Sequence, residues 1–118
     1  MVMGAGLGSR LKPFTTILPK PLVPVLGVPC IDFSLSLLRE LPTVNGVVVN
    51  IHAHADQMRS HLPSEIISHE SRELLGSAGG IRKALPHFNG EPFFALNADS
   101  ICAVDLHALQ KRHFELKA

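Results

Sequence analysis

Short apolar runs alternate with segments of helical periodicity along most of this chain, and together they predict an α/β protein. Apolar residues within 31–41 recur at helical spacing, as Ile31, Leu35 and Leu38 show. We therefore expect an amphipathic helix with a wide buried face. Residues 47–51 (VVVNI) form a short run rich in β-branched side chains, which is typical of a buried parallel strand.

Other segments continue this alternation. Apolar runs predict further strands at residues 1–3, 65–69 and 92–98, and helical spacing predicts helices at residues 54–62, 81–85 and 106–116. This order predicts a Rossmann-like, three-layer α/β/α fold with a mainly parallel sheet, and at most one domain. Parallel sheets bind ligands at the carboxyl ends of their strands. Residues 4–10 and Asp99 both follow strands, so we expect them to face one crevice.

Two stretches show neither pattern. Residues 11–29 contain five prolines, and because proline fixes φ and lacks a backbone donor, we expect a stiff, irregular loop. A long loop inside a compact domain is uncommon and often functional, which suits the rim of a binding site. Residues 76–80 (GSAGG) predict a second loop, made of small residues.

The composition is that of an ordinary globular protein. Of the 118 residues, 46% are hydrophobic and 18% charged, and the net charge is +1. A charge so close to neutral argues against nucleic-acid binding, which usually needs a strongly basic domain or stripe. No apolar run approaches the ~20 residues that span a membrane, and no signal-peptide pattern is visible. We therefore expect a cytoplasmic protein with no nucleic-acid or membrane partner.

Cysteine and histidine residues show no metal-binding pattern. Cys30 and Cys102 lack metal-ligand spacing, so we expect two buried free thiols. His52 and His54 lie two residues apart, but no cysteine or carboxylate cluster nearby completes a tetrahedral set. We expect these histidines to be solvated or hydrogen-bonded.

The amino-terminal segment carries the candidate chemistry. Glycines alternate at positions 4, 6 and 8, Arg10 follows, and Lys20 lies between two prolines. Glycine lets backbone N–H groups approach a bulky anion, and arginine and lysine supply positive charge. Glycine is common in turns that have no binding role, so a glycine-rich turn alone is weak evidence for a site. Together with the two cations, however, the turn predicts a site for a nucleoside triphosphate. The spacing matches neither a Walker loop nor a dinucleotide-binding loop.

Asp99 is the candidate metal ligand. A nucleoside triphosphate carries roughly three to four negative charges, more than Arg10 and Lys20 can offset, and a divalent cation is the usual remedy. Mg²⁺ is typically held by one or two carboxylates together with phosphates and waters. Asp99 ends an apolar strand, where the alternative role is a turn residue or helix cap.

Residues 4–29 (GAGLGSRLKPFTTILPKPLVPVLGVP) closely resemble the signature of the sugar-1-phosphate nucleotidyltransferases. The usual form in that family is close to AAGxGTRLxPxTxxxPKPLxPVxGxP. This chain departs from it at Gly4, where alanine is usual, and at Ser9, where threonine is common. Both changes are small and keep the chemistry of the loop. Residues 96–99 (LNAD) resemble the family's (L/V)-N-(G/A)-D motif, in which the aspartate binds the metal.

The resemblance implies a reaction and a role for each matched residue. A sugar-1-phosphate attacks the α-phosphorus of an NTP in line and pyrophosphate leaves; no general base is required, because the nucleophile is already an anion. Arg10 steadies the departing pyrophosphate, Lys20 holds the phosphates, and Asp99 binds Mg²⁺. The nucleotide-binding residues that it implies are Ala5, Gly6, Leu7, Gly8 and Ser9.

Residues 73–81 (ELLGSAGGI) are similar to a family segment, E-x-L-G-T-A-G-G-(I/L), that helps to read the base. The similarity assigns Glu73 and Gly79 to nucleotide binding, with a solvated glutamate and a plain turn as the alternative. With residues 79–86 and the strand at 92–98, the chain looks most like N-acetylmuramate-1-phosphate uridylyltransferases and mannose-1-phosphate guanylyltransferases. UTP is favoured, and GTP is close behind.

The resemblance covers nearly the whole chain but only the amino-terminal half of the family's proteins. It implies that residues 1–118 are the nucleotide-binding part of a single nucleotidyltransferase domain. The nucleotide-diphospho-sugar transferase fold is then incomplete at the carboxyl end, and we expect the rest of the sheet, the sugar pocket and a second metal ligand beyond Ala118. The alternative is a nucleotide-binding regulatory or truncated, non-catalytic module of the same fold.

Overall fold

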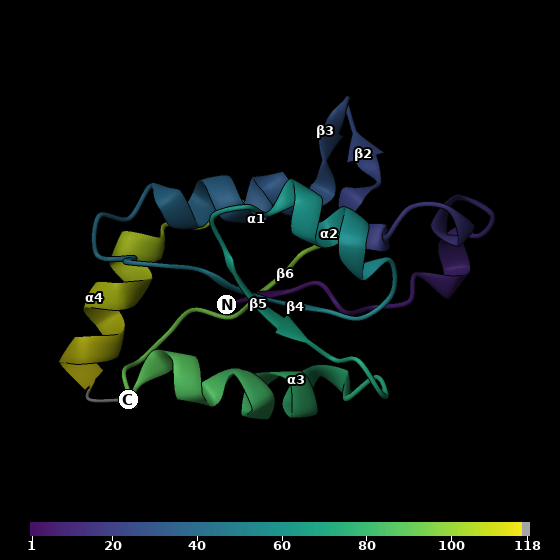
Figure 1. Ribbon diagram of the computed structural model, residues 1–118. Helices are drawn as coiled ribbons and strands as arrows, with labels where there is room; N and C mark the ends of the chain where they lie inside the picture. Colours follow the sequence, from purple (N-terminus) through teal and green to yellow (C-terminus); the bar gives the residue numbers. More distant parts are fainter. Residues whose placement is uncertain (117–118) are drawn as a thin grey trace.

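The computed structural model describes residues 1–116, which form a parallel β-sheet with helices on both faces (Figure 1). Within these residues the main sheet has four strands in the order β5-β4-β1-β6, and each neighbouring pair is parallel. The strands are β1 (Val2–Met3), β4 (Val48–Ile51), β5 (Ile66–His69) and β6 (Leu96–Asn97). The predicted mainly parallel sheet is confirmed.

The strand order decides which face each helix covers. The helices are α1 (Cys30–Arg39), α2 (Ala55–His61), α3 (Gly76–Ala84) and α4 (Leu106–Leu116). α1 and α2 connect strands that step in one direction across the sheet, whereas α3 leads back from β5 to β6. Because such crossovers are right-handed, α1 and α2 cover one face and α3 the other (Figure 1). This confirms the three-layer arrangement.

Alternating side chains of β4 divide the core into two clusters. Val49 and Ile51 are fully buried against α1 and α2 in the larger cluster, and Val48 packs with Ala84 of α3 in the smaller one. Successive strand residues point to opposite faces of a sheet, so every other position of this strand serves each core. Asn50 lies on the α3 face, at the end where β4 finishes.

Helix α1 agrees with its amphipathic pattern. It starts directly after Pro29, has Asp32 in its first turn and Arg39 in its last, and ends before Pro42. These charges complement the helix dipole at both ends. Its fully buried stripe includes Ile31 and Leu38. Within residues 1–116, none of the helices combines the length and apolar character needed to cross a bilayer.

The segment from Gly76 to Gly80 is not a loop, contrary to the prediction from its small residues. It forms the first part of α3. The small residues serve close packing here, because a Cβ built on Gly80 would lie 2.6 Å from Nδ2 of Asn50. Glycine therefore occupies position 80, inside the helix, because a larger residue would not fit between the helix and the sheet.

The strand predicted over residues 92–98 is shorter than expected. Only Leu96–Asn97 pairs with β1, through bonds from Leu96 N to Met1 O and from Ala98 N to Met3 O, both 3.0 Å. β1 itself is two residues long, so its partner can extend no further. Phe93 instead stacks on Phe88, with ring centroids 3.9 Å apart.

The proline-rich segment is irregular, as predicted, but it also contains a hairpin that the sequence did not indicate. Three 3₁₀ turns, η1 (Ser9–Leu11), η2 (Phe14–Thr16) and η3 (Lys20–Leu22), precede the antiparallel strands β2 (Pro24–Val25) and β3 (Val28–Pro29). Leu26 and Gly27 form the turn, with φ of 51° and 82°. Two positive φ values match the tight turns that join twisted strands.

Candidate functional site

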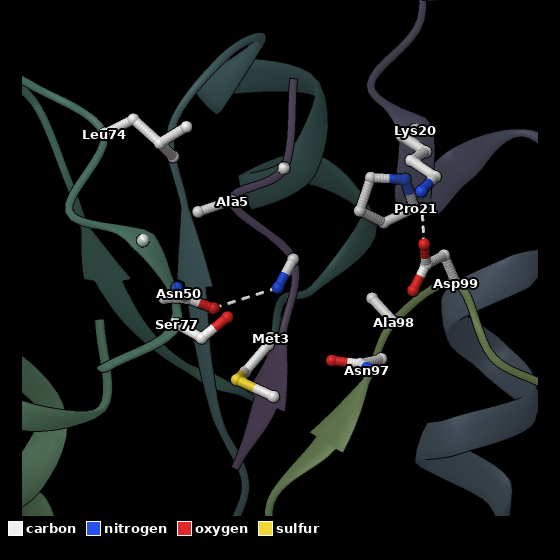
Figure 2. A pocket seen from close by; sticks show the side chains of 13 residues that line it. Met3, Ala5, Lys20, Pro21, Asn50, Leu74, Ser77, Asn97, Ala98 and Asp99 are labelled. Carbon is white, nitrogen blue, oxygen red and sulfur yellow. Dashed lines mark hydrogen bonds and ion pairs between the residues drawn. The ribbon is translucent and has the colours of Figure 1, made fainter. Parts of the chain in front are cut away.

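A cavity of about 210 Å³ opens at the carboxyl ends of the strands (Figure 2). Its floor consists of residues that follow or end β1, β4 and β6. After β1 the next strand of the main sheet, β4, lies on one side of β1, and the later strand β6 lies on the other side. The cavity therefore lies at the point where the strand order reverses, which is where open α/β sheets bind ligands.

A larger cavity, of about 660 Å³, lies at the opposite edge of the sheet. Met1, Val48 and Ile66 line it, all at the amino ends of strands. Parallel sheets seldom bind ligands at that edge. The smaller cavity is thus the better candidate despite its volume, and it is also the one lined by the predicted glycine loop.

The glycine loop is folded tightly against Lys20. Gly8 has φ 63°, and its carbonyl accepts hydrogen bonds from Leu11 N at 2.9 Å and from Thr15 Oγ1 at 2.8 Å. A Cβ on Gly8 would lie 2.7 Å from Thr15 Cγ2 and 2.9 Å from Lys20 Cβ. Both the positive φ and this close approach require glycine. Gly8 therefore shapes the loop and keeps it beside the lysine.

Lys20 and Asp99 form an ion pair at the edge of the cavity (Figure 2). The lysine comes from η3 and the aspartate follows β6, 79 residues later in the chain. Their side chains remain 31% and 38% exposed. The pair thus places one cation and one carboxylate together where an incoming ligand can reach both.

Cys30 at the start of α1 lies close to this pair. Burial raises the pKa of its thiol, the Asp99 carboxylate raises it further, and the Lys20 ammonium acts in the opposite direction. The expectation of two buried thiols is correct for Cys30 but wrong for Cys102, which is exposed on the segment after β6. That segment lacks a covering element within residues 1–116, so the cysteine there stays at the surface.

The predicted site residues divide into two groups. Ala5, Gly6, Lys20 and Asp99 line the cavity. Leu7, Gly8, Ser9 and Arg10 continue the loop past the cavity wall, and Arg10 is exposed on η1.

The predicted base-reading segment does reach the cavity, but the two residues assigned to nucleotide binding in it, Glu73 and Gly79, do not line the cavity. Glu73 is exposed, and Gly79 is half-buried on α3, where a Cβ would lie 2.7 Å from Leu75 Cβ. The residues of this segment that line the cavity are Leu74, Gly76 and Ser77. They form the wall opposite Lys20 and Asp99 (Figure 2).

Two buried polar residues beside the cavity were not predicted. Asn50 is 3% and Glu70 is 1% exposed. Asn50 Oδ1 accepts a hydrogen bond from Gly4 N at 2.9 Å, and Asn50 Nδ2 donates to Glu70 Oε1 at 2.7 Å. The one available signal was the asparagine inside an otherwise β-branched run. Glu70 follows the strand with no pattern around it.

The side chains around the cavity are suited to a hard cation rather than to zinc. Among residues 1–116, no group of three or more histidines, cysteines and carboxylates lies close enough to hold a metal. His52 and His54 bond backbone oxygens instead, those of Glu70 at 2.6 Å and Thr15 at 3.2 Å. Asp99 is the one carboxylate that lines the cavity. A single carboxylate fits Mg²⁺ that takes its remaining ligands from phosphates and waters.

Comparison of the sequence with known proteins identifies a family that it matches. The family model described as nucleotidyl transferase matches residues 1–118. An N-acetylmuramate alpha-1-phosphate uridylyltransferase of Caulobacter vibrioides is 40% identical over 110 residues, covering 86% of this chain and 45% of that protein. A mannose-1-phosphate guanylyltransferase catalytic subunit beta of Drosophila melanogaster is 33% identical, covering 96% of this chain and 33% of that protein.

A solved structure with the same fold is HddC from Yersinia pseudotuberculosis, complexed with GMP-PN. Its TM-score is 0.80 at 23% identity, covering 97% of this chain and 53% of that one. At this identity the likeness shows the fold alone. The chain spans between a third and a half of the length of these two curated relatives.

Proposed function

Because the chain belongs to the nucleotidyl transferase family, we propose that residues 1–118 are the nucleotide-binding part of one nucleotidyltransferase domain. The enzyme transfers a nucleotidyl group from an NTP to a sugar-1-phosphate and releases pyrophosphate. UTP with N-acetylmuramate-1-phosphate is the favoured pair, and GTP with mannose-1-phosphate is the second. We assign the reaction to the cytoplasm, because the proposed substrates are nucleotides.

One observation carries the proposal: the glycine loop, Lys20 and Asp99 meet at one cavity at the switch point of the sheet. A cradle of backbone N–H groups, an ammonium and a carboxylate are the groups that a metal-complexed triphosphate needs. The uridylyltransferase relative at 40% identity supports UTP over GTP.

The reaction forms one bond and breaks one. A phosphate oxygen of the sugar-1-phosphate bonds to the α-phosphorus, and the bond from that phosphorus to the bridging β-phosphate oxygen breaks as pyrophosphate leaves. The nucleophile is already an anion, so the protein contributes mainly positioning and charge neutralisation. Lys20 holds the phosphates during attack, and Arg10 steadies the pyrophosphate as charge develops on it.

The remaining predicted residues hold the nucleotide. Ala5 and Gly6 approach the nucleoside from the cavity wall, while the backbone at Leu7, Gly8 and Ser9 cradles the triphosphate. For the base, we keep Glu73 and Gly79 as proposed residues, and the wall made by Leu74, Gly76 and Ser77 is the surface that it meets.

Asp99 would hold the metal ion, and Mg²⁺ supplies neutralisation of the phosphate charge when bound. With the metal-complexed triphosphate bound, Lys20 would interact with a phosphate, and Asp99 would be free to hold the cation in place of the lysine. An ion pair whose side chains are about one-third exposed contributes at most about 1 kcal/mol. Hydrogen bonds to charged groups contribute about 1.5–3 kcal/mol each. Separating the pair is therefore easily offset by binding the triphosphate.

Calorimetric titration with the magnesium complexes of UTP, GTP, ATP and CTP tests the binding proposal. We expect the tightest binding for UTP, with GTP second. Pyrophosphate release with N-acetylmuramate-1-phosphate and mannose-1-phosphate then tests the reaction. Uptake of none of the four nucleotides would refute the proposal.

The same pair of measurements separates the second candidate, a nucleotide-binding module without turnover. Nucleotide binding without pyrophosphate release in the presence of any sugar-1-phosphate would support the module, and turnover would exclude it.

A further inference from the structure

The buried carboxylate of Glu70 forms no ion pair with any residue in the described part of the chain. Its residue is 1% exposed, directly after β5 ends. Burying a carboxylate is costly unless hydrogen bonds satisfy it. Hydrogen bonds must therefore stabilise the buried carboxylate, because apolar packing cannot.

Hydrogen bonds connect Glu70 to both sides of the candidate nucleotide cavity. Oε1 accepts from Asn50 Nδ2 at 2.7 Å, and Oε2 accepts from Leu75 N at 2.8 Å. Asn50 Oδ1 in turn accepts from Gly4 N at 2.9 Å. The carboxylate only accepts, so the amide nitrogen of Asn50 must face it and the amide oxygen must face Gly4. The order of donors and acceptors along this chain of bonds is thereby fixed.

The two ends of this chain of bonds are the two walls of the cavity. Gly4 begins the glycine loop, and Leu75 lies between Leu74 and Gly76, which line the opposite wall with Ser77. Figure 2 shows the Asn50 side chain pointing toward the start of the glycine loop, with a dashed line marking its hydrogen bond to Gly4 N. At Gly80, a Cβ would lie 2.6 Å from Asn50 Nδ2 and 2.8 Å from Glu70 Oε1. Helix α3 thus rests directly on the pair.

We propose that Glu70 is a positioning residue for nucleotide recognition. Through Asn50 and Leu75 it fixes the separation between the glycine loop and the wall of Leu74, Gly76 and Ser77, and so sets which nucleobase is accepted. This inference rests on the proposed function, because it takes the cavity as the nucleotide site. Glu70 acts on the nucleotide through these residues and does not line the cavity itself.

The substitution Glu70→Gln tests the proposal while keeping size and shape. The amide oxygen can accept from either Asn50 Nδ2 or Leu75 N, but the amide nitrogen then presents a donor to the other donor. We expect the Kd of the preferred magnesium–nucleotide, UTP or GTP, to rise at least about tenfold. The ratio of the two Kd values should move toward one, which a loss of stability alone would not produce.

Glu65→Gln is the matched control. Glu65 directly precedes β5 at its other end, its side chain is 5% exposed, and it pairs with Arg39 at 2.5 Å. The control makes the same chemical change at the far edge of the sheet. We expect it to leave both Kd values unchanged.

The double variant Asn50→Asp with Glu70→Gln provides a rescue. The carboxylate introduced at position 50 can accept from Gly4 N and from the new amide nitrogen at position 70, whose amide oxygen accepts from Leu75 N. All three hydrogen bonds are then restored, and the negative charge has moved from position 70 to position 50 on the neighbouring strand. Asn50→Asp alone places two buried carboxylates together and should be the worst variant. We expect the double variant to recover the Kd ratio, measured by calorimetry with circular dichroism as the check on folding.

The outcomes separate the inference from the proposed function. If the unaltered chain takes up no nucleotide, the function proposed for the cavity is wrong and the inference is lost with it. If the unaltered chain binds but folded Glu70→Gln keeps the same Kd values and ratio, only the role of Glu70 is wrong. If Glu70→Gln does not fold, the double variant decides: recovery supports the role, and failure to recover overturns it.

Discussion

At the scale of single residues, the candidate site depends on opposite charges brought together from distant parts of the chain. Lys20 and Asp99 pair while both remain about one-third exposed. An exposed pair of this kind adds little to stability, so its value lies in placing an ammonium and a carboxylate at one edge of the cavity. The energy of such a pair is small enough for a ligand to rearrange it.

Replacing Lys20 by alanine should therefore lower turnover much more than stability. In the proposed reaction the ammonium would meet charge that grows in the transition state, and removing such a group typically lowers kcat by about 10²–10³. The free energy of unfolding should change by no more than about 1 kcal/mol. Pyrophosphate release in the proposed reaction, together with urea denaturation, measures both effects.

Lys12→Ala is the control, because Lys12 is exposed on the same loop but away from the cavity. It should leave turnover within about twofold of the original, as expected for a screened surface charge. Equal losses in the two variants would mean that Lys20 acts only through the general charge of the loop.

At the scale of elements, helix α3 shows why a run of small residues need not form a loop. Glycine is a poor helix former, so the GSAGG segment predicts a turn on local grounds. Packing overrides this preference, because the helix must approach Asn50 and Glu70 within contact distance. The segment is thus helical and contributes Gly76 and Ser77 to the cavity wall.

Gly80→Ala should destabilise the protein, although alanine is the better helix former. Propensity alone would stabilise the helix by about 1 kcal/mol. The added methyl group would lie 2.6 Å from Asn50 Nδ2, and overpacking of this kind typically costs about 1–3 kcal/mol. The free energy of unfolding from urea denaturation should fall.

Ala78→Gly, at an exposed position of the same helix, should cost about 1 kcal/mol by propensity alone. It calibrates the helix in the same experiment. A stability gain in Gly80→Ala would show that α3 can move away from the buried pair, and would remove the reason given for its glycine.

At the scale of the whole molecule, helices cover the centre of the sheet well but leave apolar side chains exposed at its β6 edge. α1, α2 and α3 bury the central strands, and the larger core cluster extends from Val2 to Leu106, the first residue of α4. Around β6 and α4, large apolar side chains remain exposed, including Leu109 at 51% and Phe114 at 61%. Two cavities of about 270 and 310 Å³ lie there, and Phe94 and Leu109 line both.

This region should bind a hydrophobic fluorescent dye in the chain of residues 1–118, because contiguous exposed apolar surface attracts apolar ligands. Leu109→Gln removes a side chain that both cavities share, so dye fluorescence should fall. Leu26→Gln is the control, since Leu26 is 98% exposed at the tip of the β2–β3 hairpin and lines neither of these two cavities. Equal fluorescence in all three proteins would show that the region is not the binding surface.

Much of the architecture was predictable because its signals are local. The helical spacing around Ile31 and Leu38 predicted α1, and the β-branched run predicted β4. The hairpin at Leu26 was missed, since a leucine at positive φ has no propensity signal. The strand at residues 92–98 was predicted too long, because strand length depends on the partner and β1 offers only two residues.

The order of amino acids was enough to establish the alternation of strands and helices, the glycines that let a loop close on Lys20, and the resemblance to the family. The folded molecule was needed to learn that Lys20 meets Asp99 across 79 residues, that Asn50 and Glu70 join two walls, and that Leu74 and Ser77 face the cavity. Periodicity and propensity report on neighbours within a few residues of the chain. The contacts that make the site depend on strand order and register, which arise when the sheet assembles.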